Sequence, residues 1–119
     1  MKILIVDDSA FMRNMIKKML GEGTHEVREA GNADEAVRMY DEFKPNLVFL
    51  DIIMPGKNGI EVLKELKGKD AGANVVMCTS VGGQEQIIKE CVEAGASDFI
   101  TKPFTAEEIT NVISRFPVG

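Results

Sequence analysis

The feature that most constrains the fold is a short apolar run that ends in a charge. Residues 47–50 are all apolar, Val48 and Phe49 among them favour extended backbone, and Asp51 follows directly. Such a run is typical of a strand buried on both faces, and these strands occur mainly in parallel sheets. Pro55 and the glycines after it keep the next residues in a loop. Because ligands bind at the carboxyl ends of parallel strands, Asp51 marks a candidate site.

The rest of the chain repeats one pattern, in which a short apolar segment precedes a stretch with apolar residues at helical spacing. The predicted strands are residues 3–6, 25–30, 47–50, 75–78 and 98–101, and the predicted helices are residues 11–20, 32–43, 60–67, 87–92 and 105–116. Asn32 and Thr105 are each followed by Glu three residues later, which predicts helix caps. Parallel strands need crossover helices, and right-handed crossovers cover both faces of a sheet. The pattern therefore predicts a doubly wound α/β fold with a five-stranded parallel sheet and five helices.

Composition excludes several classes of protein. The 119 residues, 45% of them hydrophobic, suit one domain over residues 1–119 with no effector domain. With 14 basic and 19 acidic residues and no basic run, nucleic acid or an anionic membrane is not expected as a partner. Asp7 and Asp8 interrupt the apolar start, so we expect no signal or spanning segment and a cytoplasmic protein. Cys78 and Cys91 lack disulfide or metal spacing and are predicted to be buried free thiols.

Polar side chains follow four of the predicted strands. Asp7 and Asp8 come after the first strand, Asp51 after the third, Thr79 after the fourth and Lys102 after the fifth. Neighbouring strands lie only about 4.7–4.9 Å apart, so these side chains can share one site. Three carboxylates and one ammonium sum to a formal charge of −2, which a divalent cation would offset. Oxygen donors without His or Cys favour Mg²⁺.

The predicted site suggests a separate role for each residue. Asp51, on the central strand, is the candidate nucleophile toward a phosphoryl group, and Asp7 and Asp8 form a metal pair. Lys102 would neutralise one phosphoryl oxygen, and the Thr79 hydroxyl would donate a hydrogen bond to another. Each residue alone has an ordinary alternative as a turn former, helix cap or surface lysine. Their shared position at strand ends favours the functional interpretation.

These residues also carry a resemblance to a known family over the whole chain. The sequence resembles the response regulator receiver domains of two-component signalling, and within them the single-domain chemotaxis regulators of the CheY type. The motifs concerned are Ile3-Leu4-Ile5-Val6-Asp7-Asp8-Ser9, Asp51-Ile52-Ile53-Met54-Pro55 with Gly59, Thr79-Ser80, Gly95-Ala96-Ser97-Asp98-Phe99 and Lys102-Pro103-Phe104. The resemblance implies the strand order 2-1-3-4-5. It also implies a cis Lys102–Pro103 bond.

The resemblance further implies a mechanism and partners. Asp51 would take a phosphoryl group from a histidine kinase, with Mg²⁺, or Mn²⁺ in its place, held by Asp7 or Asp8, Asp51 and the backbone carbonyl of Ile53. Such a protein catalyses its own phosphorylation and dephosphorylation but is not an enzyme in the ordinary sense. The switch would pass from Thr79 to the aromatic Phe99. A monomer would then bind an output protein, a motor component or adaptor, on the face of the fourth helix, fifth strand and fifth helix, and a phosphatase is a further candidate partner.

Two apolar positions bear on the lifetime of the phosphoryl group. Ile53 and Val81 each lie two residues after a predicted site residue, Asp51 and Thr79 respectively, where family members can carry polar groups that influence the attacking water. We predict that these two side chains hinder water and slow hydrolysis. Phe99 stands where the family often has Tyr, so no phenolic hydroxyl is available for a partner.

Three alternatives differ in what they require of the sequence. A phosphorelay intermediate would use the same residues but pass its phosphoryl group to a histidine phosphotransfer protein. A small magnesium phosphatase would also form an aspartyl phosphate, yet no DxD pair follows a strand here and a cap domain is absent. A flavodoxin-like binding module would need a loop rich in Ser, Thr and Gly after the first strand, which this sequence lacks.

Overall fold

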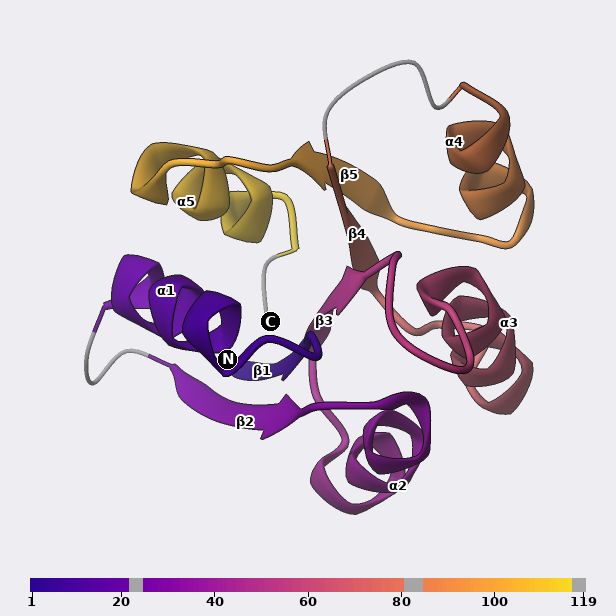
Figure 1. Ribbon diagram of the computed structural model, residues 1–119. Helices are drawn as coiled ribbons and strands as arrows, with labels where there is room; N and C mark the ends of the chain where they lie inside the picture. Colours follow the sequence, from indigo (N-terminus) through magenta and orange to yellow (C-terminus); the bar gives the residue numbers. More distant parts are fainter. Residues whose placement is uncertain (22–24, 81–84, 117–119) are drawn as a thin grey trace.

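The computed structural model describes residues 1–21, 25–80 and 85–116 as one twisted parallel sheet covered by helices on both faces (Figure 1). The strands are β1 (Lys2–Val6), β2 (Glu26–Ala30), β3 (Leu47–Asp51), β4 (Val75–Thr79) and β5 (Asp98–Thr101). The helices are α1 (Ala10–Leu20), α2 (Ala33–Phe43), α3 (Gly59–Lys69), α4 (Glu85–Glu93) and α5 (Ala106–Ser114). The strand order is β2-β1-β3-β4-β5, which confirms the predicted fold.

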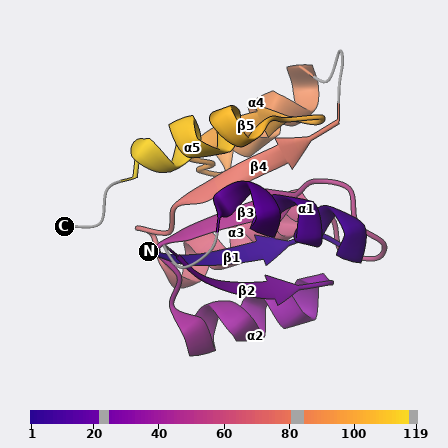
Figure 2. The same ribbon diagram turned by 90° about the vertical axis from the view of Figure 1, so that its left-hand side faces the viewer.

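Two apolar cores lie on opposite faces of the sheet. One cluster joins the sheet to α1 and α5 through Ile16, Leu20, Ile109 and Val112. The other joins it to α2, α3 and α4. Figures 1 and 2 show this division, with α1 and α5 together on one side of the strands and the other three helices on the opposite side. The sheet centre is therefore dry, and every residue of β3 and β4 is buried.

Local signals explain most element boundaries. Ser9, Asn32, Asn58 and Thr105 each accept a hydrogen bond from the backbone N–H three residues later and so cap the following helix. β2 is an edge strand, and its burial alternates because only one side chain in two faces the core. The expected caps at Asn32 and Thr105 are thus confirmed.

The third helix is longer than predicted. The sequence suggested that Gly68 begins a loop, but α3 continues through Lys69 and is capped at Asp70. A Cβ at Gly68 would meet no other atom within 4 Å, so this position lies open to solvent and the glycine costs the helix only about 1 kcal/mol. The Lys67 ammonium then holds the following turn by donating to the carbonyls of Ala71 and Ala73 at 2.7 and 3.0 Å.

The loop after β3 folds tightly against the strand end. The Gly59 N–H donates to the Ile52 carbonyl at 2.7 Å. A Cβ on Gly59 would lie 2.1 Å from the Asp51 carbonyl oxygen and 2.7 Å from Ile52 Cα. Only glycine allows this approach, which fixes the backbone on which the Asp51 side chain stands.

Candidate functional site

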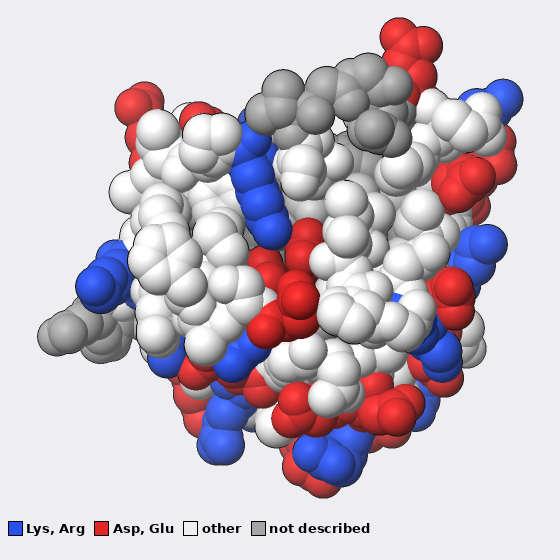
Figure 3. Space-filling view, in the orientation of Figure 1, with Lys and Arg blue, Asp and Glu red and all other residues white. Residues whose placement is uncertain are grey.

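An acidic hollow lies at the carboxyl ends of the central strands. Oxygens of Asp7, Asp8 and Asp51 all lie within 4.8 Å of one another. Asp7 and Asp51 are 2% and 7% exposed, whereas Asp8 is open to solvent. Figure 3 shows acidic side chains at the bottom of a hollow in this face, with a basic side chain reaching toward them. The three predicted carboxylates are therefore neighbours, although Asp51 comes 44 positions after Asp7 in the sequence.

Lys102 joins two of these carboxylates. Its ammonium lies 3.1 Å from Asp7 Oδ2 and 3.2 Å from Asp51 Oδ1. The backbone N–H of Lys102 donates to the Thr79 carbonyl at 2.7 Å, which ties the end of β5 to that of β4. The Lys102–Pro103 peptide bond is cis. The side chain that follows β5 thus closes a charge cluster built on three different strands.

The environment shifts the proton affinities of this cluster. Burial raises the pKa of Asp51 above its usual value, and the nearby Asp7 adds to this effect while Lys102 opposes it. Burial alone would lower the pKa of Lys102, but the two carboxylates outweigh it and the pKa is raised. The ammonium therefore remains charged at neutral pH and compensates only part of the acidic charge.

The donor set fits a hard divalent cation. Three carboxylate oxygens converge, and neither nitrogen nor sulfur ligands are part of the group. Ions of this class prefer oxygen ligands and retain waters, which the exposed side of Asp8 allows. The charge of −2 left after pairing with Lys102 matches the charge of such an ion.

The two predicted switch residues lie on β4 and β5, the two strands that follow β3 in the sheet order. Thr79 is 8% exposed, and its hydroxyl donates to the Ser80 carbonyl at 3.1 Å. Phe99 is in register with Met77 and packs half-buried against the core under α2, α3 and α4. Because side chains alternate along a strand, Thr79 shares the face of Met77 and Phe99. Asp51 is in register with Cys78, the residue before Thr79, so Asp51 and Thr79 both lie at the carboxyl edge of the sheet on neighbouring strands.

The remaining predicted positions differ in how far the structure describes them. The Ile53 side chain, two residues after Asp51, is 68% exposed. Val81 lies outside the described residues. Cys78 and Cys91 are buried free thiols, as predicted, and burial raises the pKa of Cys78 to about 12.

Sequence reasoning missed Arg13, which contacts the acidic loop, and its partner Glu29. The Arg13 side chain on α1 donates to the Asp7 carbonyl at 2.6 Å and to Glu29 Oε1 on β2 at 3.0 Å. Arg13 lies four residues after the cap Ser9, and residues at this spacing share one face of a helix. That spacing was the available signal, but nothing in the sequence identified Glu29 as the partner.

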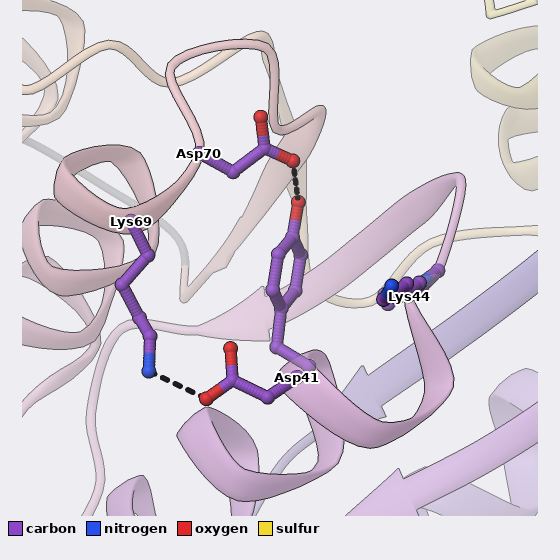
Figure 4. Close-up of a pocket in the computed structure, with 6 residues that line it drawn as sticks. Asp41, Lys44, Lys69 and Asp70 are labelled. Atoms are coloured by element: carbon purple, nitrogen blue, oxygen red, sulfur yellow. Dashed lines mark hydrogen bonds and ion pairs between the residues drawn. The ribbon is translucent and has the colours of Figure 1, made fainter.

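A second polar cavity, of about 290 Å³, lies at the opposite end of the sheet, between the ends of α2 and α3 (Figure 4). The Tyr40 hydroxyl donates to Asp70 Oδ2 at 2.8 Å, and the Lys69 ammonium lies 2.6 Å from Asp41 Oδ2. Burial, with the neighbouring Asp70, raises the pKa of Tyr40. These paired groups fasten α2 to the end of α3 and account for the polar lining without a ligand.

Comparison with known proteins agrees with this geometry. A family profile described as "Response regulator receiver domain" matches residues 3–114. The chain is 49% identical over 113 residues to "Chemotaxis protein CheY" of Halobacterium salinarum, covering 95% of this chain and 93% of the relative. It is 48% identical to the protein of the same name from Bacillus subtilis, covering 96% and 95%.

A solved structure gives the same result for the fold. The chemotaxis protein CheY4 of Vibrio cholerae superposes with a TM-score of 0.89 at 25% identity, covering 98% of both chains. No helix among the described residues is long and apolar enough to span a bilayer. With a family match over most of its length and full-length relatives near 50% identity, the chain belongs to the receiver domain family of response regulators.

Proposed function

We propose that this protein is a chemotaxis response regulator that accepts a phosphoryl group on Asp51 from a histidine kinase. The observation that carries the proposal is the convergence of Asp7, Asp8 and Asp51 with the ammonium of Lys102 at one strand edge. Names of full-length relatives support the chemotaxis role. Family membership implies the kinase partner.

The metal we assign to the site is Mg²⁺, which Mn²⁺ can replace. Asp7, Asp8 and Asp51 would hold it, together with the backbone carbonyl of Ile53. When bound, the ion supplies positive charge that offsets the acidic cluster and the charge of an incoming phosphoryl group. The support from the structure is the all-oxygen donor set and its uncompensated negative charge.

The protein's own groups account for the transfer step. An oxygen of ionised Asp51 attacks the phosphorus, an O–P bond forms, and the P–N bond of the phosphohistidine breaks with its electron pair going to the imidazole nitrogen. Lys102 remains protonated because its pKa is raised, and its ammonium neutralises a phosphoryl oxygen. Hydrolysis reverses the modification when water attacks the phosphorus and the O–P bond breaks, which regenerates the carboxylate.

The signal would leave the site through Thr79. A phosphoryl group adds about −1.5 to −2 charges and new acceptor oxygens, which compete with the Ser80 carbonyl for the Thr79 hydroxyl. Movement of Thr79 would free space on the face that it shares with Phe99 and change the surface of α4, β5 and α5, where the output protein binds. Shifting a population from 1:99 to 99:1 needs about 5.5 kcal/mol, which two or three charge-assisted hydrogen bonds can supply.

The phosphoryl group should last longer with the exposed Ile53 side chain than with a polar residue at this position. An exposed apolar side chain two residues after Asp51 cannot orient water by a hydrogen bond, so we expect slow hydrolysis. The double variant Ile53→Asn with Val81→Glu should lose its phosphoryl group faster than the wild type. Equal or slower decay in the variant would contradict this part of the proposal.

Intact mass after incubation with acetyl phosphate and Mg²⁺ tests the proposal. The wild type should gain one phosphoryl group and Asp51→Asn should not, whereas Tyr40→Phe, altered at the far end of the sheet, should react normally. An adduct that persists in Asp51→Asn would overturn the assignment. Phosphorylation-dependent binding of an output protein would support the switch, whereas rapid transfer to a histidine phosphotransfer protein would favour a phosphorelay. Repeated turnover of small phosphate esters would favour a phosphatase.

A further inference from the structure

Arg13 connects the acidic loop to the neighbouring strand. Its Nη1 donates to the Asp7 carbonyl oxygen at 2.6 Å, and its Nε donates to Glu29 Oε1 at 3.0 Å. Lys17 binds the other oxygen of Glu29 at 2.7 Å. The Arg13 side chain is only 19% exposed, whereas that of Lys17 is 38% exposed. Of these two cations on α1, Arg13 is the one that contacts the backbone of the acidic loop.

The contact with the carbonyl falls at a particular place in the loop. The Asp7 carbonyl belongs to the peptide group that joins Asp7 to Asp8, so a hydrogen bond to it fixes the plane of that peptide. Asp7 is held by further bonds, since its N–H donates to the Ala30 carbonyl at 3.1 Å and its Oδ1 accepts from the Ser9 N–H at 2.9 Å. Asp8 is exposed, and its direction depends on the peptide plane. The hydrogen bond from Arg13 therefore falls on the peptide group from which the Asp8 backbone continues.

The positive charge of Arg13, taken alone, would weaken the binding of a cation to the acidic site. A guanidinium near the acidic hollow repels a bound cation, so its removal should tighten binding if only electrostatics mattered. Glu29 offsets this charge, and its hydrogen bonds with Lys17 and Arg13 lower its pKa, so that it stays ionised at neutral pH. When Arg13 is removed, the loss of positioning should thus lower the cation affinity of the acidic site, whereas the loss of charge should raise it.

We propose that Arg13 is a positioning residue that orients the Asp7–Asp8 peptide and thereby increases the affinity of the acidic site for a divalent cation. The inference rests on the metal site of the proposed function. Partners that orient metal ligands in this way are commonly worth a factor of about 10 to 100 in affinity. Arg13 donates only to the backbone of the loop, so we expect an effect at the low end of this range.

The test measures Mn²⁺ affinity from the electron paramagnetic resonance signal of free Mn²⁺ in the unphosphorylated protein. Arg13→Lys keeps the charge, but one ammonium cannot reproduce both bonds of the guanidinium fork. We expect this variant to bind Mn²⁺ about threefold more weakly, and Arg13→Gln about tenfold more weakly, than the wild type. Lys17→Gln removes the same charge from Glu29 without touching the Asp7 carbonyl and should bind with equal or higher affinity.

Salt separates the two effects further. The charge contribution should shrink between 0.1 and 0.5 M KCl because ions screen it, whereas the deficit of Arg13→Lys should persist. Circular dichroism without metal shows whether each variant is folded. If Arg13→Gln is unfolded, the Mn²⁺ affinity of Arg13→Lys alone tests the inference. Wild-type affinity in Arg13→Lys, or tighter binding in Arg13→Gln, would overturn the inference. Absence of Mn²⁺ binding by the wild type would instead count against the proposed metal site.

Discussion

Replacing Lys102 by Met removes the one ammonium between two buried carboxylates while nearly keeping the length of the side chain. In the folded protein this ammonium lies 3.1 Å from Asp7 and 3.2 Å from Asp51, whose side chains are 3% and 9% exposed. The variant leaves both acids without this partner. We expect it to be markedly less stable than the wild type when no metal is present.

The size of the effect follows from these distances. At an effective dielectric constant of about 20, each contact corresponds to an attraction of about 5 kcal/mol. Burial of the three charged groups offsets much of this, and loss of one member of a buried pair typically costs about 3–5 kcal/mol. Asp51 has a raised pKa and can reduce the repulsion between the two unpaired carboxylates by taking up a proton. We therefore expect a loss near the lower limit, about 3 kcal/mol at pH 7, or about 12 °C in Tm for a domain of this size.

Added Mg²⁺ should reverse the loss. The divalent ion supplies the missing positive charge, and binding at about 100 times its Kd stabilises a folded protein by about 2.7 kcal/mol. Because the competing ammonium is gone, Mg²⁺ should stabilise Lys102→Met more than it stabilises the wild type. Urea unfolding of both proteins at pH 7, with and without Mg²⁺, measures each quantity.

A matched control comes from the far end of the sheet. Lys69→Met breaks the exposed pair with Asp41, in which the side chains are 37% and 54% exposed, and should cost no more than about 1 kcal/mol and show no dependence on Mg²⁺. The reasoning is refuted if metal-free Lys102→Met unfolds at the wild-type urea concentration. It is equally refuted if Mg²⁺ stabilises the wild type more than the variant.

Three further predictions concern the backbone, a distant hydrogen bond and pH. Gly59→Ala should lower the free energy of unfolding by about 2 kcal/mol and slow phosphorylation, because its Cβ would lie 2.1 Å from the Asp51 carbonyl oxygen. Gly68→Ala has no neighbour within 4 Å and should raise the free energy of unfolding by up to about 1 kcal/mol. Equal stability of the two variants in urea unfolding would contradict this. Tyr40→Phe loses the 2.8 Å bond to Asp70 and should cost about 1 kcal/mol without changing Mn²⁺ affinity. Because burial raises the pKa of Asp51, the acid takes up a proton at a higher pH in the folded than in the unfolded chain. As the pH is lowered, Mn²⁺ affinity should therefore begin to fall at a higher pH than an ordinary Asp would cause. An affinity that falls only where an ordinary Asp takes up its proton would contradict the shift.

The sequence was sufficient for the fold because the signals were local. Apolar runs such as residues 47–50 mark buried strands, and caps such as Asn32 mark helix starts, so each element follows from a few neighbouring residues. Gly68 was misinterpreted because a glycine signals a helix end only when its backbone is needed there. In this chain Asp70 ends the helix, and the open surface at Gly68 tolerates the residue.

The acidic cluster was predictable for a different reason. Charged residues directly after buried strands must meet at one edge of a parallel sheet, so Asp7, Asp51 and Lys102 could be brought together without coordinates. The hydrogen bond of Arg13 to the Asp7 carbonyl could not be predicted from the sequence, because it depends on how α1 is rotated and on a partner on β2. The same holds for the register of β3 against β4, which places Asp51 beside Cys78 and next to Thr79.

The most direct test of the central claim is to locate the phosphoryl group in the sequence. An acyl phosphate can be reduced by borohydride, which converts the modified aspartate to homoserine, and peptide mass spectrometry then identifies the position. After reaction with acetyl phosphate and Mg²⁺, homoserine should appear at residue 51 and depend on the metal. Homoserine at residue 7 or 8 in place of residue 51, or none at residue 51 in a protein that has gained the mass of a phosphoryl group, would contradict the account.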